Sequence, residues 1–280
     1  MEFKTIELKE SIFANNDREA DRLRAELKGE GCQTLDTPEE LAALSDLLGV
    51  PTRAEAGEES LTLIQLEPLM AVAGVAARKK DGETVSGDAG TYFKREDGTL
   101  YVLLCDGMGS GPGAGRESSL AVRLLEQFLM AGVETGHALA TLNSALALRG
   151  EEEGGFTTVD LLQVDLFTGE GAVYKLGAAP TYVRRGSSER RIAGSSLPAG
   201  LAPSEHAVPD HTRLRLEAGD CVLMVSDGIA GTGDDAWVRE RLAKFDGESP
   251  KELARSLITD SPEGATDDRT ALVVRIARRT

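Results

Sequence analysis

The chain has 280 residues, of which 41% are hydrophobic, and it carries a formal net charge of −16. A chain of this length can bury a substantial core, in one large domain or two smaller ones. Nucleic acid is not expected as a partner, because there is no basic surplus to neutralise phosphates. The acidic surface would also repel a phosphorylated substrate unless bound cations reversed the potential locally.

The cysteines and the N-terminus indicate the compartment. Cys32, Cys105 and Cys221 show no metal-ligand spacing, which is typical of reduced core residues in a cytoplasmic protein. None begins the Cys-x5-Arg pattern with which cysteine-based phosphatases hold phosphate. No signal-peptide pattern follows Met1, and no apolar stretch approaches the roughly 20 residues of a membrane-spanning helix. We therefore expect a cytoplasmic protein, or the soluble part of a membrane-associated one.

Residues 1–67 are interpreted as a small, mainly helical accessory segment with a regulatory or dimerising role, since they show no chemistry of their own. Apolar residues recur among charges over 11–30 and predict an amphipathic helix there. Pro38 begins a second predicted helix, with Thr37 as its N-cap. Residues 61–66 alternate as an exposed strand does.

The pattern changes at Met70 to short strands and two pairs of helices, so residues 68–280 form the second predicted domain. Blocks of strands separated by pairs of helices indicate an α+β fold in which helices cover antiparallel sheets. Residues 110–115 are interpreted as a loose glycine-rich loop. Strands are predicted at 70–78, 91–94, 101–106, 157–166, 172–176, 181–184, 190–193, 214–216, 221–226 and 271–276, and helices at 116–130, 138–148, 236–245 and 250–258.

Two of the apolar strands end in the same dipeptide, Asp106-Gly107 and Asp227-Gly228. A single Asp-Gly is more often a simple turn, but its repetition after two buried strands favours a function. Gly107 leaves the backbone beside Asp106 unshielded by any Cβ atom. Its carbonyl oxygen can therefore join the carboxylate in holding a hard cation.

Acidic residues recur beside predicted strands at Asp88, Asp106, Asp227 and the pair Asp267-Asp268. Oxygen ligands without nearby His or Cys favour Mg²⁺ or Mn²⁺ over zinc. Converging carboxylates would repel one another unless divalent ions neutralised them. Two such ions would lower the pKa of a shared water and offset the charge of an attacked phosphoryl group. The sequence thus predicts a two-ion site for phosphate chemistry.

These motifs resemble the metal-dependent PPM (PP2C-type) protein serine/threonine phosphatases, and within them the catalytic domain of the stage II sporulation protein E family. The similarity extends from about Glu67 to Arg278. It implies a four-layer α-β-β-α sandwich that holds two manganese or magnesium ions between its sheets. It also implies hydrolysis of phosphoserine on a protein by direct attack of a metal-activated water. The motifs that carry the resemblance are Val85-Ser86-Gly87-Asp88, residues 106–111, Leu176–Thr181, Ser196–Gly200, Ser226–Ile229 and Asp267–Thr270.

The resemblance implies a role for each predicted catalytic and metal-binding residue. Asp106 would bridge both ions, and the Gly107 carbonyl would bind one of them. Asp227 and Asp267 would hold the other ion. Asp88 would contact the site through ordered water.

The resemblance also implies a support residue, a substrate and a switch. Asp268 stands where relatives have Asn or Asp, so it would support the site rather than bind metal. The implied substrate is a phosphorylated anti-anti-sigma factor, whose dephosphorylation frees a sigma factor. The paired helices at 116–130 and 138–148 would act as a switch, biased by residues 1–67.

Two alternative functions stay open. The fold could be kept while catalysis is lost, although Asp fills every expected ligand position. The loop at 109–115 resembles a dinucleotide fingerprint, but the following region shows hairpins rather than βαβ units. His137, His206 and His211 lie away from the acidic motifs and are expected at the surface, as is Arg116.

Overall fold

The structure is a computed structural model of the chain. Contacts divide the chain into two compact units, residues 1–70 with 278–280, and residues 71–277. The domain boundary predicted after residue 67 stays a prediction. The structure describes residues 5–8, 24–28, 39, 42–43, 45–46, 49–56, 60–149, 155–201, 208–230, 235–260 and 266–279.

The N-terminal unit contains a four-stranded sheet of order β1-β2-β4-β3, which the sequence did not predict. The predicted helix over 11–30 is wrong at residues 24–28, where β2 pairs antiparallel with both β1 and β4. Arg24-Ala25-Glu26-Leu27-Lys28 alternates polar and apolar residues, and pairing with two neighbours selects this period of two over the helical period. Residues 11–23, 29 and 30 lie outside the described part. The strands are β1 (Thr5–Leu8), β2 (Arg24–Lys28), β3 (Thr52–Ala56) and β4 (Ser60–Gln65).

Two further predictions for this unit agree with the structure. The described residues between Glu39 and Asp46 are helical, as expected for the helix predicted to begin at Pro38. The strand predicted at 61–66 is confirmed as β4. The described residues of this unit are nevertheless mainly strand rather than mainly helix.

The second unit contains two five-stranded sheets. Each of its strands overlaps a predicted one, because apolar β-favouring runs are separated by turn residues, although the strands predicted at 91–94 and 214–216 begin earlier, at Asp88 and Asp210. The first sheet has the order β11 (Ser188–Ile192), β10 (Thr181–Arg185), β13 (Cys221–Val225), β14 (Arg269–Arg278) and β5 (Leu69–Arg78). The second has the order β12 (Asp210–Arg215), β9 (Glu170–Leu176), β8 (Val159–Asp165), β7 (Thr99–Asp106) and β6 (Asp88–Lys94).

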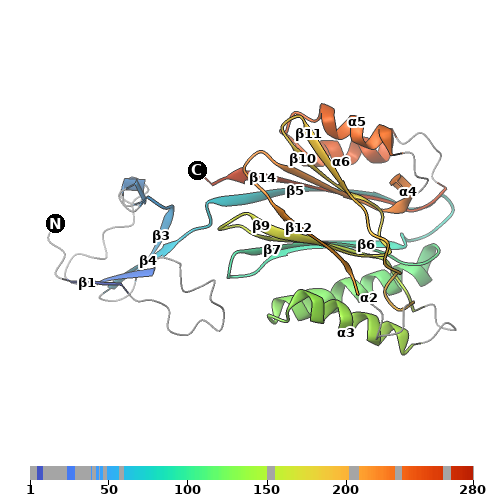
Figure 1. Cartoon of the computed structure of the whole chain (residues 1–280), viewed down its shortest axis with the longest axis horizontal. Helices are drawn as coiled ribbons and strands as arrows, with labels where there is room; N and C mark the ends of the chain where they lie inside the picture. Colours follow the sequence, from blue (N-terminus) through green and yellow to red (C-terminus); the bar gives the residue numbers. More distant parts are fainter. Residues whose placement is uncertain are drawn as a thin grey trace. The chain divides into compact units, whose positions relative to one another are not determined.

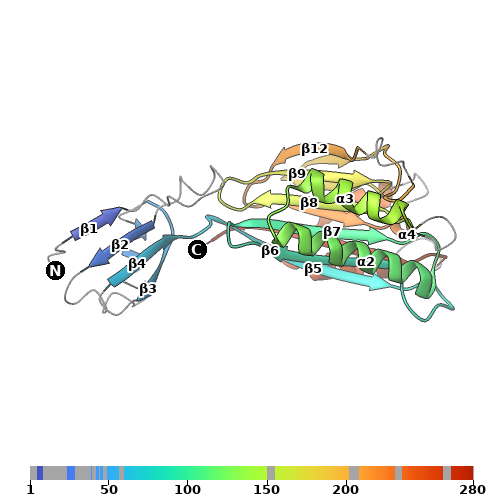
Figure 2. The ribbon, with the colours of Figure 1, turned by 90° about the horizontal axis from the view of Figure 1, so that it is seen from below.

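Helices cover the outer faces of both sheets, which confirms the predicted α-β-β-α sandwich (Figure 1). The helices α2 (Gly111–Met130) and α3 (Thr135–Ala147) lie across the sheet that contains β7 and β8 (Figure 2). The helices α5 (Ala236–Lys244) and α6 (Pro250–Thr259) cover the other sheet. A four-residue helix that the sequence did not predict, α4 (Asp227–Ala230), begins at the second Asp-Gly motif.

Each helix pair closes a separate hydrophobic core. Leu103 of β7 packs with Leu125 of α2 and Leu142 of α3, and all three are fully buried. Leu223 of β13 packs with α5 and α6 in the second cluster. Burying such a side chain contributes about 1.5–3 kcal/mol, so these clusters hold the four layers together. Cys105 is also fully buried, and burial raises the pKa of its thiol, as expected for an inert core cysteine.

The glycine-rich segment differs from its prediction as a loose loop, because helix α2 already begins at Gly111. Pro112 occupies the first turn, where its missing N–H is not needed and its fixed φ suits a helix. Ala114 is buried, which anchors this turn. The next strand, β8, returns antiparallel to β7, so the segment is not part of a βαβ nucleotide-binding unit.

Candidate metal centre

Asp88 and Asp106 lie directly opposite each other in the β6–β7 ladder. Tyr101, Leu103 and Cys105 of β7 pack against the helices, so strand alternation turns Asp106 toward the facing sheet. Cross-strand partners share a face, with Cβ atoms about 4.5–5.5 Å apart. The two carboxylates are therefore neighbours between the sheets.

Asp88 presents two acceptors that the protein does not satisfy. Both carboxylate oxygens are buried, and neither has a hydrogen-bond partner among the described residues. Burial raises the pKa of Asp88 to about 6. The Ser226 and Thr270 hydroxyls act in the opposite direction on this pKa, but neither makes a hydrogen bond of normal geometry to it. Buried oxygens without partners are groups that a bound cation or its water ligands would satisfy.

The charge of Asp227, in the second Asp-Gly motif, acts on Asp106 of this pair. Burial, followed by the charges of Asp88 and Asp227, raises the pKa of Asp106 to about 9. Burial also raises the pKa of Asp227, and the charges of Asp267 and Asp268 add to that effect. Asp227 is thus an electrostatic neighbour of both Asp106 and Asp267, although these residues lie far apart in the sequence.

Asp268 connects segments that carry the acidic residues. Its carboxylate accepts hydrogen bonds from the backbone N–H of Lys80 and of Gly87, both at 2.8 Å. Gly87 in turn accepts a hydrogen bond from the backbone N–H of Gly107 at 3.1 Å. Asp268 is 2% exposed, and each of its carboxylate oxygens binds a backbone N–H of the segment that connects β5 to β6. The structure therefore gives Asp268 a supporting position, held by the backbone beside Asp88 and Gly107.

Gly107 is required by packing as well as by any cation. A Cβ atom at this position would lie 2.1 Å from the backbone oxygen of Ala114 in α2. Gly228 has a similar constraint, because its Cβ atom would lie 2.0 Å from the backbone oxygen of Asp268. Both glycines of the Asp-Gly motifs thus permit a close approach of the backbone beside the carboxylates.

The described aspartates converge without forming a closed ligand set. Within the described ranges, no group of three or more His, Cys, Asp or Glu side chains has metal-holding geometry. The chemistry of the donors nevertheless fits a hard divalent cation, since they are carboxylates whose mutual repulsion such an ion would relieve. His137 pairs with Glu134, and His211 stacks on Tyr174, so neither belongs to this cluster. His206 lies outside the described residues.

Sequence reasoning missed two sets of residues next to the carboxylates. Thr157 and Thr158 bind the backbone of Asp106. Asp160 and Lys175 form a buried ion pair on the same sheet. The strand register places Asp160 opposite Lys175, which no pattern in the sequence showed.

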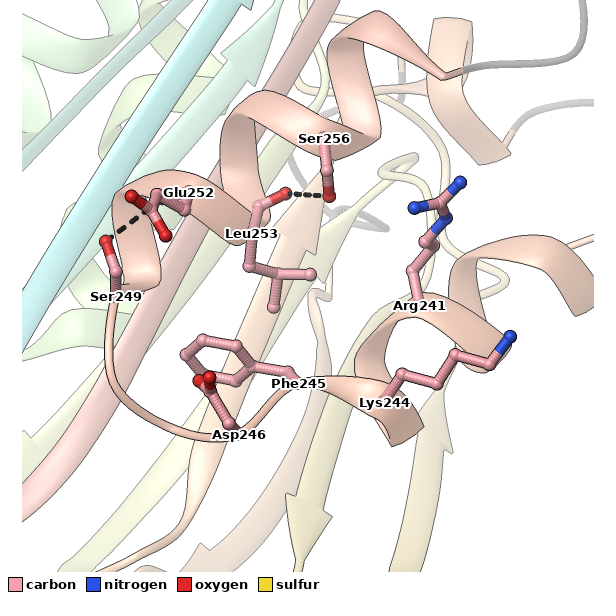
Figure 3. Close-up of a pocket in the computed structure, with 8 residues that line it drawn as sticks. All are labelled: Arg241, Lys244, Phe245, Asp246, Ser249, Glu252, Leu253 and Ser256. Atoms are coloured by element: carbon pink, nitrogen blue, oxygen red, sulfur yellow. Dashed lines mark hydrogen bonds between the residues drawn. The ribbon is translucent and has the colours of Figure 1, made fainter.

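A hollow elsewhere in the fold is not part of this cluster. It has a volume of about 230 Å³ and lies between α5 and α6, on the helix-covered side of the first sheet (Figure 3). None of the aspartates discussed above lines it. Its lining residues are Arg241, Lys244, Phe245, Asp246, Ser249, Glu252, Leu253 and Ser256.

Comparison with known proteins identifies the family. The family model described as Stage II sporulation protein E (SpoIIE) matches residues 96–277. The chain belongs to the SpoIIE family. PP2C-type phosphatases, the class to which the matched SpoIIE domain belongs, generally depend on Mn²⁺ or Mg²⁺.

Two SpoIIE sequences and one solved structure define the extent of the likeness. The chain is 31% identical to the Priestia megaterium protein and 32% identical to that of Bacillus subtilis (strain 168), over 216 residues in each case. These alignments cover 74% of this chain but only 36% and 26% of the two relatives. The chain thus spans about a third or less of those proteins.

The structure of the PP2C phosphatase domain of B. subtilis SpoIIE, solved with a fragment of its regulatory domain, matches with a TM-score of 0.76 at 26% identity. That match covers 100% of this chain and 83% of the other. None of the helices in the described part of the chain has the length and apolar character needed to cross a membrane. The cytoplasmic location stays a prediction.

Proposed function

We propose that this chain is a metal-dependent protein serine/threonine phosphatase. The observation that carries the proposal is the convergence of Asp88, Asp106 and Asp227, whose carboxyl pKa values are raised by burial and, for Asp106, by the charges of the other two. Such an arrangement is unfavourable in a protein that binds no cation. Membership of the SpoIIE family and the PP2C-like fold support the proposal.

The residues have distinct proposed roles. Asp106 and the Gly107 carbonyl would hold one ion, and Asp106, Asp227 and Asp267 would hold the second. Asp88 would order water beside the ions. When bound, Mn²⁺ or Mg²⁺ supplies an activated water and offsets the charge of the attacked phosphoryl group. Asp106 must lose its proton to bind a cation, so binding is coupled to proton release near neutral pH.

The proposed substrate is phosphoserine on a protein, specifically a phosphorylated anti-anti-sigma factor. The family resemblance supports this choice. The net charge of −16 would repel a phosphorylated protein, so the ions serve to admit the substrate as well as to promote the reaction.

The N-terminal unit is proposed to regulate the phosphatase domain or to mediate a homodimer. The match to a SpoIIE structure that includes part of a regulatory domain, which covers this entire chain, supports this role. The unit is best tested by removing residues 1–66, because buried Glu67 pairs with Arg279 at 2.9 Å and should be kept. An unchanged basal activity together with an unchanged oligomeric state, measured by light scattering, would contradict the role.

Helices α2 and α3 are proposed to set the geometry of the metal-binding turn. Gly107 packs against Ala114 of α2. Asn143 of α3 accepts a hydrogen bond from the backbone N–H of Gly200 at 2.8 Å. Ala199 pairs with Thr157, whose hydroxyl donates to the Asp106 carbonyl. A movement of either helix would therefore reach the turn through a continuous set of contacts.

Release of phosphate from a phosphoserine protein tests the proposed activity. We expect release that depends on Mn²⁺, is abolished by EDTA and is lost in Asp227→Asn. Asp246→Asn removes an aspartate from the hollow between α5 and α6 and serves as the matched control. Full activity in Asp227→Asn would refute the site. Mn²⁺ binding without any phosphate release would favour the alternative of a catalytically silent interaction module.

A capture experiment tests the proposed substrate. The double variant Asp227→Ala, Asp267→Ala should retain its uncleaved phosphoprotein in a pull-down with a purified phosphorylated anti-anti-sigma factor. The unphosphorylated form is the control. Equal retention of both forms would contradict recognition of the phosphate.

A further inference from the structure

Two consecutive threonines hold the backbone of Asp106. The Thr157 hydroxyl donates a hydrogen bond to the Asp106 carbonyl at 2.7 Å. The Asp106 N–H donates to the Thr158 hydroxyl at 3.1 Å. Thr157 is 1% exposed, so bulk water does not compete for the bond that its hydroxyl makes.

These side chains act where the regular ladder has ended. The described β7–β8 pairing ends at Leu104 and Asp160, two residues before Asp106. Beyond this point Thr157 bridges to Gly107 on one side and to Ala199 on the other. Its backbone N–H and carbonyl both pair with Ala199, at 3.1 and 2.8 Å. Thr157 is therefore fixed in position independently of its hydroxyl.

The peptide group that joins Asp106 to Gly107 is hydrogen-bonded to residues that lie just before β8 and just before β6. Its carbonyl oxygen accepts from Thr157, and its N–H, which belongs to Gly107, donates to the Gly87 carbonyl at 3.1 Å. Because a peptide group is planar, these two bonds, together with one from the Thr158 N–H to the same carbonyl, restrict the orientation of the whole plane. That orientation restricts ψ of Asp106 and φ of Gly107, and so limits the directions open to the Asp106 carboxylate and to the following Gly107 carbonyl.

We propose that Thr157, assisted by Thr158, is a positioning residue that sets the geometry with which Asp106 and Gly107 bind a divalent cation. The inference rests on the proposed function and concerns the metal site of that function. Thr157 acts through the Asp106–Gly107 peptide and contacts neither the cation nor the substrate. Outer partners of metal ligands typically change metal affinity by about 10–100-fold when they are removed.

The local bonding predicts that affinity will change more than stability. The Asp106 carbonyl also accepts a hydrogen bond from the Thr158 N–H at 2.8 Å, so it keeps a partner when the Thr157 hydroxyl is removed. The variant Thr157→Val conserves the shape of the side chain. It should therefore leave the fold intact while the Asp106–Gly107 peptide loses one of its three hydrogen bonds.

The test is Mn²⁺ binding to the full 280-residue chain, measured by calorimetry and by the electron paramagnetic resonance signal of free Mn²⁺. We expect Thr157→Val to weaken binding at least about 10-fold and Thr157→Ser, which keeps the hydroxyl, to stay within about threefold of the wild type. Thr135→Val is the matched control. It removes an equally short bond, 2.7 Å from the Thr135 hydroxyl to the Gln163 side chain, at a residue that is 3% exposed. It should leave Mn²⁺ affinity unchanged.

The outcomes separate this inference from the proposed function. If the wild type binds no Mn²⁺, the proposed function fails and this inference fails with it. If the wild type binds Mn²⁺ and Thr157→Val binds equally well, only the inference is overturned. Should Thr157→Val fail to fold by circular dichroism, Thr158→Val decides. Weakening of about 10-fold would support the positioning role, and wild-type affinity would overturn it.

Discussion

Two cross-strand pairs of charged residues on one sheet differ in whether the protein neutralises their charge. Asp160 and Lys175 lie opposite each other in the β8–β9 ladder, as Asp88 and Asp106 do in the β6–β7 ladder. Asp160 also pairs with Leu104, which shares the face of Asp106, so both pairs lie between the two sheets. One pair joins opposite charges and the other joins like charges.

The Asp160–Lys175 pair is compensated within the chain. The Lys175 ammonium lies 2.8 Å from Asp160, and both side chains are 1% exposed. The same carboxylate oxygen accepts from the Thr181 hydroxyl, and Lys175 also donates to the Ala179 carbonyl. No such compensation reaches Asp88, whose oxygens have no partner among the described residues. The same sheet can thus neutralise a buried acid with a lysine, which supports an external cation as the partner of Asp88 and Asp106.

The largest effect is expected at the uncompensated pair. Asp106→Asn should lower Mn²⁺-dependent phosphate release by at least about 100-fold, because the proposed bridging ligand is lost. In EDTA the same variant should melt at a higher temperature than the wild type, since Asn removes the cost of keeping a buried carboxyl protonated above the pKa of unfolded Asp. Phosphate assays and calorimetry check the two parts. A lower melting temperature of Asp106→Asn in EDTA would contradict the view that this pair destabilises the metal-free protein.

The compensated pair should respond in the opposite sense. Lys175→Met leaves Asp160 buried without its counter-charge and should lower the free energy of unfolding by about 3–5 kcal/mol. Adding Asp160→Asn should restore part of this loss, because the orphaned charge is then removed. Urea unfolding measures both variants. If Lys175→Met proved as stable as the wild type, the contrast between the two pairs would not hold.

A smaller effect is expected from substituting two glycines, one of which packs closely against α2 and one of which does not. Gly107→Ala forces a Cβ atom against Ala114 and should destabilise the fold by about 1–3 kcal/mol while weakening Mn²⁺ binding. Gly113→Ala in the first turn of α2 meets no atom within 4 Å and should stabilise by about 0.5–1 kcal/mol. Thermal unfolding and Mn²⁺ titration of both variants compare them. Equal effects would indicate that Gly107 is not constrained by α2.

The smallest expected effect is on pH dependence without metal. The pKa values of Asp88 and Asp106 are raised to about 6 and about 9, above roughly 3.9 for unfolded Asp. Their contribution to stability is therefore full below about pH 4 and is lost as the pH rises through these folded-state values. In EDTA, the melting temperature should fall by a few degrees more between pH 5 and 9 in the wild type than in Asp106→Asn. Parallel curves would argue that Asp106 is ionised throughout.

The sequence supported much of the fold and the choice of acidic residues, for local reasons. Apolar runs with strand or helix periodicity marked the elements of the second unit, and the repeated Asp-Gly after buried strands marked Asp106 and Asp227. Local sequence patterns gave wrong predictions where contacts with other segments select the secondary structure. The segment at 24–28 is a strand because two strands flank it, and the segment from Gly111 is helical because Pro112 and buried Ala114 anchor its first turn.

By itself the sequence determined the chemistry of the donors, which is carboxylate oxygen beside glycine, and the order of the elements that present them. The tertiary structure alone decided which acids meet. Strand register places Asp88 opposite Asp106, and Lys175, instead of a second acid, opposite Asp160. A residue's electrostatic partner is set by distance in space, and no local periodicity encodes the register between strands that are far apart in the chain.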